Sequence, residues 1–448
     1  MEEHIPESEL LLFAFDPNAV RQDRQRAIVE HVEQCAKCRA DLDFYAVAED
    51  DLSDADVWEP VVGSATLETL RAYAARIAAE DEEADELLAP LFSSPDTDIW
   101  KHIGNRQRFL TGGVVRRLSA HAHGICENEP LDAMTFADAA IAVAESLADD
   151  RYPGRAVFEL RGTAWKERAN AQLHLGQFSG ALESLSRAEV AYRRLTSPAL
   201  GLATVALVRA SVFYQQQRLD EAATMAEEAE RGFAHLGDNE RRMRAIYLRG
   251  GVRYEAQDLP AAMALFRQVI AYGEEGHDAM WIARASYALG NCEVDSGDLA
   301  EASMHFHSAL TIFRELGPAT ERICTEWGIA RVFLQNGKIN EGIGRLREVE
   351  IEFESRGMVT DAALAALDAA DALLALGQSK QLVELASRLF RVFMDAEMVT
   401  GALTAMAYIK DAAADARLTP EGIDTVRKYL RRSERQPDLL FLPPQNPS

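Results

Sequence analysis

Three residues near the start of this 448-residue chain have types and a spacing suited to metal binding. His31, Cys35 and Cys38 follow the pattern His, three residues, Cys, two residues, Cys, after an amphipathic stretch, 17–30, that predicts a helix. On a helix, positions i, i+4 and i+7 share one face, so the three side chains can converge on one ion. Zn²⁺ takes imidazole nitrogen and thiolate sulfur in tetrahedral geometry, and His4 is the upstream candidate for a fourth ligand.

Four protein ligands leave no open position for water, so we expect one structural zinc ion and no hydrolytic chemistry. The alternative interpretation is a helix with two buried cysteines and an exposed histidine.

The segment 4–45 resembles the zinc-binding domain of the anti-sigma factor family, in which an upstream His or Cys precedes the same three-ligand motif. An apolar stretch, 10–15, fits the helix after the first ligand. The resemblance implies a sigma factor of the extracytoplasmic-function type as partner, bound through this domain and a following helix. The segment 65–92, with the acidic run 80–86, is the candidate for that helix.

Other clusters of reactive residue types give weaker patterns. His121, His123 and Cys126 lie before the repeats without a clear fourth ligand, and we interpret them as an incidental helix end. His305 and His307 are about 200° apart on a helix and cannot easily chelate one ion. The sequence contains no phosphate-binding loop motif and no recognisable nucleophile–base–carboxylate set, so we expect a protein that is not an enzyme.

The rest of the chain is dominated by a repeat. Short loops between amphipathic helices recur at successive spacings of 41, 40, 40, 40 and 40 residues. In each loop a residue suited to a tight turn ends a first helix, helix A, and in most loops a small residue five positions later begins the packing of a second helix, helix B. The turn positions are Gly176, Gln217, Gln257, Gly297, Gly337 and Gly377.

These hairpins resemble the tetratricopeptide repeat family over about residues 160–395. Trp165 fits the family's early aromatic residue, while Leu289 with Gly290, and Gly250, fit the pair before the turn. The period of 40 instead of 34 implies longer helices. The resemblance implies an all-α fold with a right-handed solenoid of about six to seven helix-turn-helix repeats.

The two ends of the solenoid are also predicted. A degenerate repeat with a helix B near 135–147 precedes the regular ones, and a capping helix follows at 420–432.

Stacked hairpins of this kind present a concave face lined by helix A, where a protein or peptide partner binds. Aromatic, Asn and Arg side chains suit peptide recognition, because they supply rigid contact area and paired hydrogen bonds. The alternative is that several of these aromatic residues pack between helices. The family's groove positions correspond to Asn170, Tyr214, Tyr247, Tyr254, Tyr287, Asn291, Trp327 and Arg331.

Charge and composition limit the class of partner. The net charge of −25 argues against general nucleic-acid binding, which requires clustered Lys and Arg. Residues 1–100 hold 25 acidic against 7 basic residues, a net of −18, which suits either a basic protein partner or simple solubility. The sequence shows no targeting segment, no apolar run long enough for a membrane span and no disulfide framework, so we expect a cytoplasmic protein.

Together these features predict a zinc-binding helical domain at 1–48, an acidic helical linker at 49–112, the repeat superhelix at 113–432 and a flexible tail at 433–448. The predicted function is a bacterial, cytoplasmic, anti-sigma-factor-like transcription regulator whose repeats bind a peptide or protein. The alternative is a repeat scaffold or adaptor with a structural zinc module and no sigma-factor partner.

Overall fold

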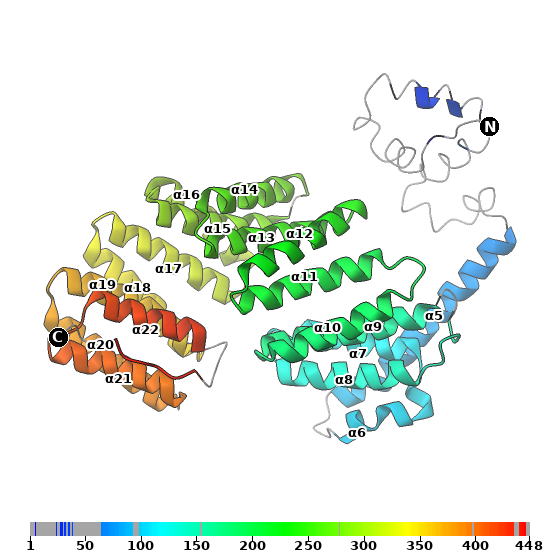
Figure 1. The fold of residues 1–448 in the computed structure, drawn as a ribbon, viewed down its shortest axis with the longest axis horizontal. Helices are drawn as coiled ribbons and strands as arrows, with labels where there is room; N and C mark the ends of the chain where they lie inside the picture. Colours follow the sequence, from blue (N-terminus) through cyan, green and yellow to red (C-terminus); the bar gives the residue numbers. More distant parts are fainter. Residues whose placement is uncertain are drawn as a thin grey trace. The chain divides into compact units, whose positions relative to one another are not determined.

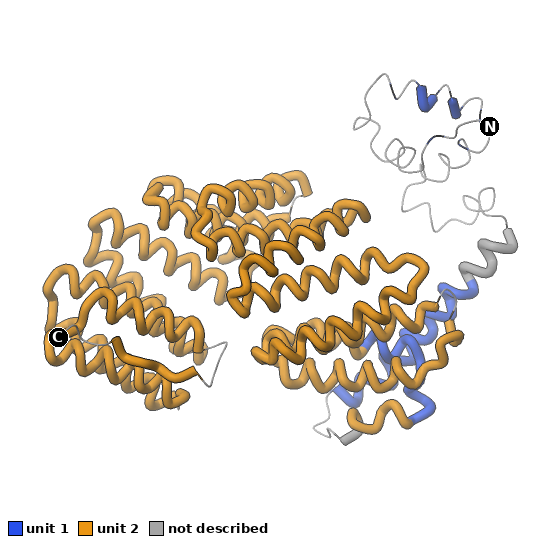
Figure 2. The backbone as a smooth tube through the Cα atoms, in the orientation of Figure 1, with its two compact units in different colours: residues 1–99, 106–117 blue, residues 100–105, 118–448 orange. Residues whose placement is uncertain are grey.

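All regular elements among the described residues are helices, which confirms the predicted all-α fold (Figure 1). The computed structural model describes residues 5, 24, 27–29, 31–32, 35, 38, 64–92, 98–152, 155–276, 278–396, 398–433 and 439–444. The chain divides into two compact units, coloured separately in Figure 2: Met1–Ile99 with Arg106–Arg117, and Trp100–Asn105 with Leu118–Ser448. No helix of the described residues is long and apolar enough to cross a bilayer.

The first unit contains the long helix α5 (Ser64–Phe92), where the sequence predicts a helix, and the start of α7 (Gly112–Ile125). The two helices approach very closely at Gly113. A Cβ atom at this glycine would lie 2.1 Å from the carbonyl oxygen of Glu80, so a larger residue would force the helices apart. Leu88 on α5 is fully buried in the same unit.

The acidic run of α5 is partly neutralised by the chain itself. Arg116 lies 2.7 Å from the Asp81 carboxylate, and Arg117 lies 2.7 Å from Asp85. Glu82 and Glu86 are exposed on the same helix. A basic partner of α5 therefore meets only part of the negative charge that the sequence suggests.

The second unit is a stack of helical hairpins in which each helix contacts mainly its neighbours in the sequence. Short helices follow α5 in the sequence, where the chain alternates between the two units: α6 (Asp98–Lys101), η3 (Ile103–Asn105) and η4 (Gln107–Phe109). The A helices are α9 (Ala156–His174), α11 (Ala199–Gln215), α13 (Asn239–Glu255), α15 (Ala279–Ser296), α17 (Ala319–Gln335), α19 (Val359–Ala375) and α21 (Thr400–Ala414). The B helices are α8 (Pro130–Ser146), α10 (Phe178–Tyr192), α12 (Leu219–His235), α14 (Leu259–Glu275), α16 (Leu299–Glu315), α18 (Ile339–Ser355), α20 (Ser379–Asp395) and α22 (Pro420–Ser433).

The turns between A and B helices confirm the predicted repeat. All six predicted turn residues have left-handed backbone conformations, with φ between 60° and 90°. Four of them are glycines, while Gln217 and Gln257 adopt the same conformation with a side chain. The small residues five positions after the first four turns, Ala181, Ala222, Ala262 and Ala302, are fully buried, as close packing of the two helices requires.

The solenoid core changes character along the stack. Several separate clusters of buried apolar residues follow one another between α9 and α17. One large cluster then runs from Ile323 on α17 to α22 and includes Phe441. The core is therefore segmented in the middle repeats and continuous at the C-terminal end.

The last helix explains this change. α22 contacts α19 as well as α21, so it packs on the A helices as a cap, at the position that the sequence predicts for a capping helix. Phe441 packs against Tyr408 and Tyr429, and the Tyr429 hydroxyl donates to the Leu439 carbonyl at 3.1 Å. Residues 439–441 are thus attached to the last repeat.

Candidate functional site

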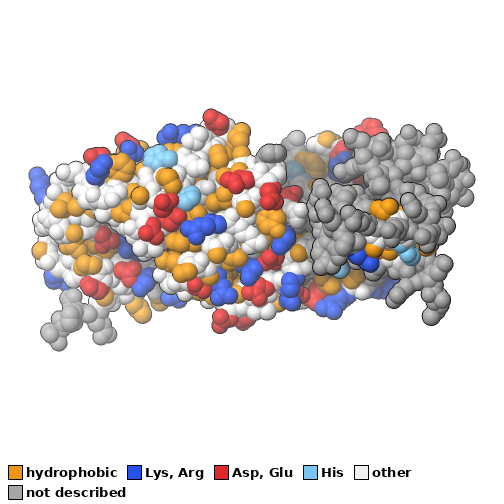
Figure 3. Space-filling view, turned by 90° about the horizontal axis from the view of Figure 1, so that it is seen from above, with side chains coloured by type: hydrophobic (Ala, Val, Ile, Leu, Met, Phe, Trp, Pro, Cys, Tyr) orange, Lys and Arg blue, Asp and Glu red, His pale blue; other side chains and the backbone are white. Residues whose placement is uncertain are grey.

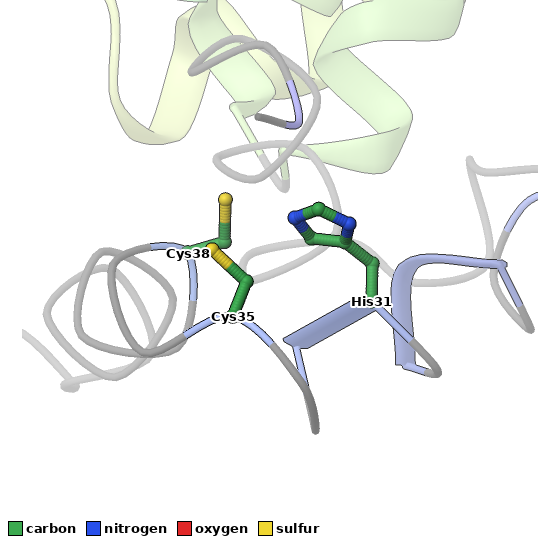
Figure 4. A group of neighbouring side chains, drawn as sticks. All are labelled: His31, Cys35 and Cys38. Atoms are coloured by element: carbon green, nitrogen blue, oxygen red, sulfur yellow. The ribbon is translucent and has the colours of Figure 1, made fainter. Parts of the chain in front are cut away.

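His31, Cys35 and Cys38 come together, as their spacing predicts (Figure 4). One possible ligand atom from each lies within 4.8 Å of the others, and the two cysteines are buried. Two thiolates bound to one zinc ion at about 2.3 Å would lie ~3.8 Å apart, so small side-chain movements suffice to bind the ion.

The surroundings of these side chains fit a metal. The Nε2 atom of His31 is buried without a hydrogen-bond partner, and a buried unpaired nitrogen is unfavourable unless a ligand completes it. Ile28 and Ile5 pack around the two cysteines. His4, the predicted fourth ligand, lies outside the described residues, although its neighbour Ile5 belongs to this cluster. The donor set of one imidazole and two thiols is one that Zn²⁺ prefers.

A second candidate site is a pocket of about 510 Å³ on the A helices, which we call the A-helix pocket. It extends over α11, α13 and α15, and its wall is mostly apolar. Five of the eight predicted groove residues line it: Tyr214, Tyr247, Tyr254, Tyr287 and Asn291. The remaining lining residues are Leu207, Ser211, Arg244, Leu248, Gly251, Glu255, Phe266 and Ala288.

The repeat period produces this concentration of tyrosines. Tyr214 and Tyr254 occupy equivalent positions one 40-residue period apart, as do Tyr247 and Tyr287. On α13, residues three or four positions apart lie on the same face. Gly251 lies in the middle of that face, and its lack of a side chain leaves space in front of Tyr214, whose hydroxyl oxygen would be 3.6 Å from an added Cβ.

The tyrosine rings are supported from behind. The ring of Tyr247 lies 5.5 Å from Phe266 and 5.5 Å from Trp281, and the ring of Tyr287 lies 6.1 Å from Phe306. These aromatic residues therefore combine the two roles considered from the sequence, because they pack between helices and also line the pocket.

Hydrogen bonds hold the polar rim. Tyr254 donates to Asp295 at 2.6 Å, and Tyr214 lies at 3.5 Å from Glu255. Burial raises the pKa of Tyr247 to about 12, and burial followed by the bond to Asp295 raises the pKa of Tyr254 further. The hydroxyls of Tyr247 and Tyr254 are therefore protonated near pH 7.

The other three predicted groove residues do not line the A-helix pocket. Arg331 adjoins the pocket, since it donates to Asn291 at 3.2 Å and to Asp295 at 2.8 Å. The indole nitrogen of Trp327 donates to Asp368 at 2.8 Å. Asn170 on α9 donates to the buried Glu167 at 2.8 Å.

The histidine clusters that the sequence analysis sets aside have separate contacts. His121 packs on Phe136 with ring centres 4.6 Å apart, and His123 bonds to Glu167 at 3.1 Å. Burial raises the pKa of Cys126 to about 11, so its thiol is a poor nucleophile at neutral pH.

His305 and His307 also have different partners. The first contacts Glu293 at 2.8 Å and the second contacts the Ser303 carbonyl at 2.6 Å. Within the described residues, His31, Cys35 and Cys38 are the group with metal-ligand geometry.

Several pocket residues were missed by sequence reasoning, among them Arg244, Leu248, Gly251 and Glu255. The signal was present, because these residues continue the helical face marked by Tyr247 and Tyr254. They were not predicted because they do not correspond to the groove positions of the tetratricopeptide repeat family.

No protein-family model matches the chain, and no curated protein matches it in sequence. Solved structures with a similar fold include a Rap protein complexed with Competence and Sporulation Factor, at 14% identity and a TM-score of 0.55 over 72% of this chain and 87% of that one. Another is aspartyl phosphate phosphatase F from Bacillus subtilis, at 13% identity and a TM-score of 0.51 over 88% of this chain and 96% of that one. These likenesses show a shared solenoid of tetratricopeptide-like repeats.

Proposed function

We propose that the repeats of this protein bind a peptide segment of a regulatory partner in the A-helix pocket. The observation that carries the proposal is the convergence of four tyrosines on one apolar pocket of about 510 Å³. Tyrosine provides a large, rigid contact surface with a polar tip, which is typical of peptide-binding surfaces.

The shape of the pocket supports the binding of a ligand, because the protein's own side chains do not fill it. Gly251 leaves its centre open, and side chains from three successive A helices surround the space. The Rap protein with a similar fold was solved with a bound factor, Competence and Sporulation Factor. Although the other neighbour is named a phosphatase, we propose binding without catalysis for this chain, since the pocket presents mainly apolar and aromatic groups.

The test is selection of peptides from a random dodecapeptide library on the full-length chain, followed by calorimetric titration of the best binders. Gly251→Trp places an indole in the pocket and should weaken binding by about tenfold or more, which corresponds to about 1.4 kcal/mol. Gly344→Trp on α18 is the matched control, because Gly344 is exposed with nothing within 4 Å of an added Cβ. Equal affinity of the two variants for the peptide would show that the peptide does not bind in the A-helix pocket.

We further propose that the N-terminal segment binds one zinc ion through His31, Cys35 and Cys38, with His4 as fourth ligand. The close approach of the three ligand atoms and the unpaired His31 nitrogen support this part. Bound zinc would fix the local fold and would perform no reaction, because four protein ligands fill its coordination.

On the same basis we propose an anti-sigma-factor-like role in a cytoplasmic regulator of transcription. The zinc module and α5 would together contact a basic sigma factor of the extracytoplasmic-function type. The exposed carboxylates of Glu82 and Glu86 support an electrostatic contribution from α5. The competing function is a scaffold whose partner proteins bind only to the repeats. The A-helix pocket supports the scaffold and the anti-sigma-factor-like regulator equally.

Metal analysis and binding assays separate these proposals. Purified full-length protein should contain about one zinc per chain, and Cys35→Ser/Cys38→Ser should lose it. Cys292→Ser is the control, because Cys292 is a buried residue of α15. A sigma factor that binds the full chain, and fails to bind a chain lacking residues 1–95, supports the anti-sigma role. Binding of partners that survives this deletion supports the scaffold.

A further inference from the structure

The A-helix pocket has charges of opposite sign at its two ends. Arg244 is the sixth residue of α13, and Glu255 is the last residue of that helix. Glu255 lies eleven positions after Arg244, which corresponds to about 16 Å along the helix axis. The pocket wall between the two ends is apolar and aromatic, with Tyr247, Leu248 and Phe266 among its residues.

The backbone adds to this polarity. The N-terminus of a helix carries a partial positive charge and the C-terminus a partial negative charge. The lining residues reach the C-terminal turn of α11 and of α13, through Tyr214 and Glu255, whereas at the other end the lining begins five to eight residues after the first residue of each A helix. The partial negative charge of these two C-termini therefore has the same sign as Glu255, and the positive charge at the other end comes from Arg244.

Both charged side chains can exchange their present contacts for a ligand. Arg244 is paired with Glu240, one turn away on the same helix at 2.7 Å, and both side chains are about half exposed or more. An exposed pair of this kind contributes about 0.5 kcal/mol or less. Glu255 is exposed and contacts the Tyr214 hydroxyl at 3.5 Å.

The nearby charges are held more firmly, so they do not compete for the same role. Asp295 accepts hydrogen bonds from Tyr254 at 2.6 Å and from Arg331 at 2.8 Å. Elsewhere on this unit, acidic and basic side chains are interspersed over the surface seen in Figure 3. The separation of the two signs along the pocket therefore rests on Arg244 and Glu255 of α13.

We propose that the A-helix pocket recognises a peptide segment with an acidic and a basic side chain on either side of an apolar one. The acidic side chain pairs with Arg244 and the basic one with Glu255. This inference rests on the proposed function, because it specifies the ligand of the same pocket. The charges fix the direction in which the segment lies, and the tyrosines hold the apolar side chain between them.

The experiment is the selection of random dodecapeptides on four full-length proteins: wild type, Arg244→Glu, Glu255→Lys and the control Arg253→Glu. Arg253 lies on the same helix, is partly exposed, and does not line the pocket. Peptides selected by the wild type and by the control should carry the acidic–apolar–basic pattern. Arg244→Glu should select basic–apolar–basic peptides, and Glu255→Lys should select acidic–apolar–acidic ones.

Titration of one wild-type peptide then gives the size of the effect. Replacing its acidic residue by Lys should weaken binding to the wild type by about fivefold to tenfold, and Arg244→Glu should restore it. Selected peptides that share an apolar residue but no charge pattern overturn this inference and leave the proposed function intact. Selection that is no stronger than on Gly251→Trp overturns the proposed function, and the inference with it.

Discussion

The A helices are open at α11 to α15 and covered at α19 to α21. In the open part, Leu248 and Gly251 of α13 line the A-helix pocket. Three periods later, the equivalent positions of α19 are Asp368 and Asp371, and both carboxylates pair with Arg427 of α22. The same place in the repeat is therefore either a pocket or a docking site for the chain's own last helix.

The comparison indicates that the repeat backbone determines where a ligand can lie. Two side chains per helix then determine what binds there. A glycine and a leucine leave an apolar space, whereas two aspartates attract a guanidinium. The covered end is also an internal example of a basic side chain held by carboxylates on the A helices.

The largest effect is expected at the covered end. Arg427→Glu would place a third negative charge beside Asp368 and Asp371, where burial already raises the pKa of Asp371. We expect a loss of about 3 kcal/mol of unfolding free energy and faster amide exchange in α22. Urea unfolding and hydrogen exchange measure both, with the exposed Arg431→Glu as control. Equal stability of the two variants would show that these ion pairs do not hold α22.

Two adjacent glycines at the open pocket should respond in opposite ways. A Cβ at Gly250 would lie 2.5 Å from the ring of Phe266, so Gly250→Ala should destabilise the protein by about 1–3 kcal/mol. Gly251 has only ordinary contacts at 3.6 Å or more, so Gly251→Ala should stabilise it by up to about 1 kcal/mol. Thermal unfolding compares them directly. Similar melting temperatures for both variants would mean that Phe266 yields easily.

The stability of the folded protein should decrease at alkaline pH because of a tyrosine that lines the open pocket. The pKa of Tyr247 is raised to about 12 in the folded state, above the value of about 10 in an unfolded chain. The folded state therefore binds more protons between these values, and stability falls as pH rises from 10 to 12, by on the order of 1–2 kcal/mol. Tyr247→Phe should show a shallower decline in denaturant midpoint over this range. Parallel curves for the two proteins would assign the loss to other groups.

The smallest effects concern the hydroxyls of the pocket rim. Tyr254→Phe removes a 2.6 Å hydrogen bond to Asp295 and should cost about 1 kcal/mol. Tyr214→Phe removes a 3.5 Å contact with the exposed Glu255 and should cost less than about 0.5 kcal/mol. Chemical denaturation resolves the difference. A reversed order would indicate that the Tyr214 contact is stronger than its length suggests.

The sequence predicted the repeat well because local rules determine it. The 40-residue period placed six turn residues, and all six adopt the left-handed conformation that such turns need. All four pocket tyrosines were predicted as positions that correspond to the groove of the tetratricopeptide repeat family. The approach of His31, Cys35 and Cys38 likewise followed from spacing along a short segment.

The features that the sequence did not predict depend on contacts between residues far apart in the chain. The capping helix was predicted, but the pairing of Arg427 with Asp368, 59 residues away, has no local signal. The hydrogen bond from the Trp327 indole to Asp368, 41 residues away on α19, has no local signal either. An amphipathic pattern shows that a helix has a buried face and does not identify the surface that covers it.

The continuity of the C-terminal core has a consequence for folding. In a repeat protein, stability is the sum of local hairpin terms and interfaces between neighbours, so regions of the stack can unfold separately. The cluster from Ile323 to Phe441 joins α17 to α22 into one cooperative block, whereas the pocket repeats rest on several small clusters. We expect the C-terminal block to unfold as one unit and the pocket repeats to open before it. A bound peptide joining α11, α13 and α15 would extend cooperative unfolding into those repeats.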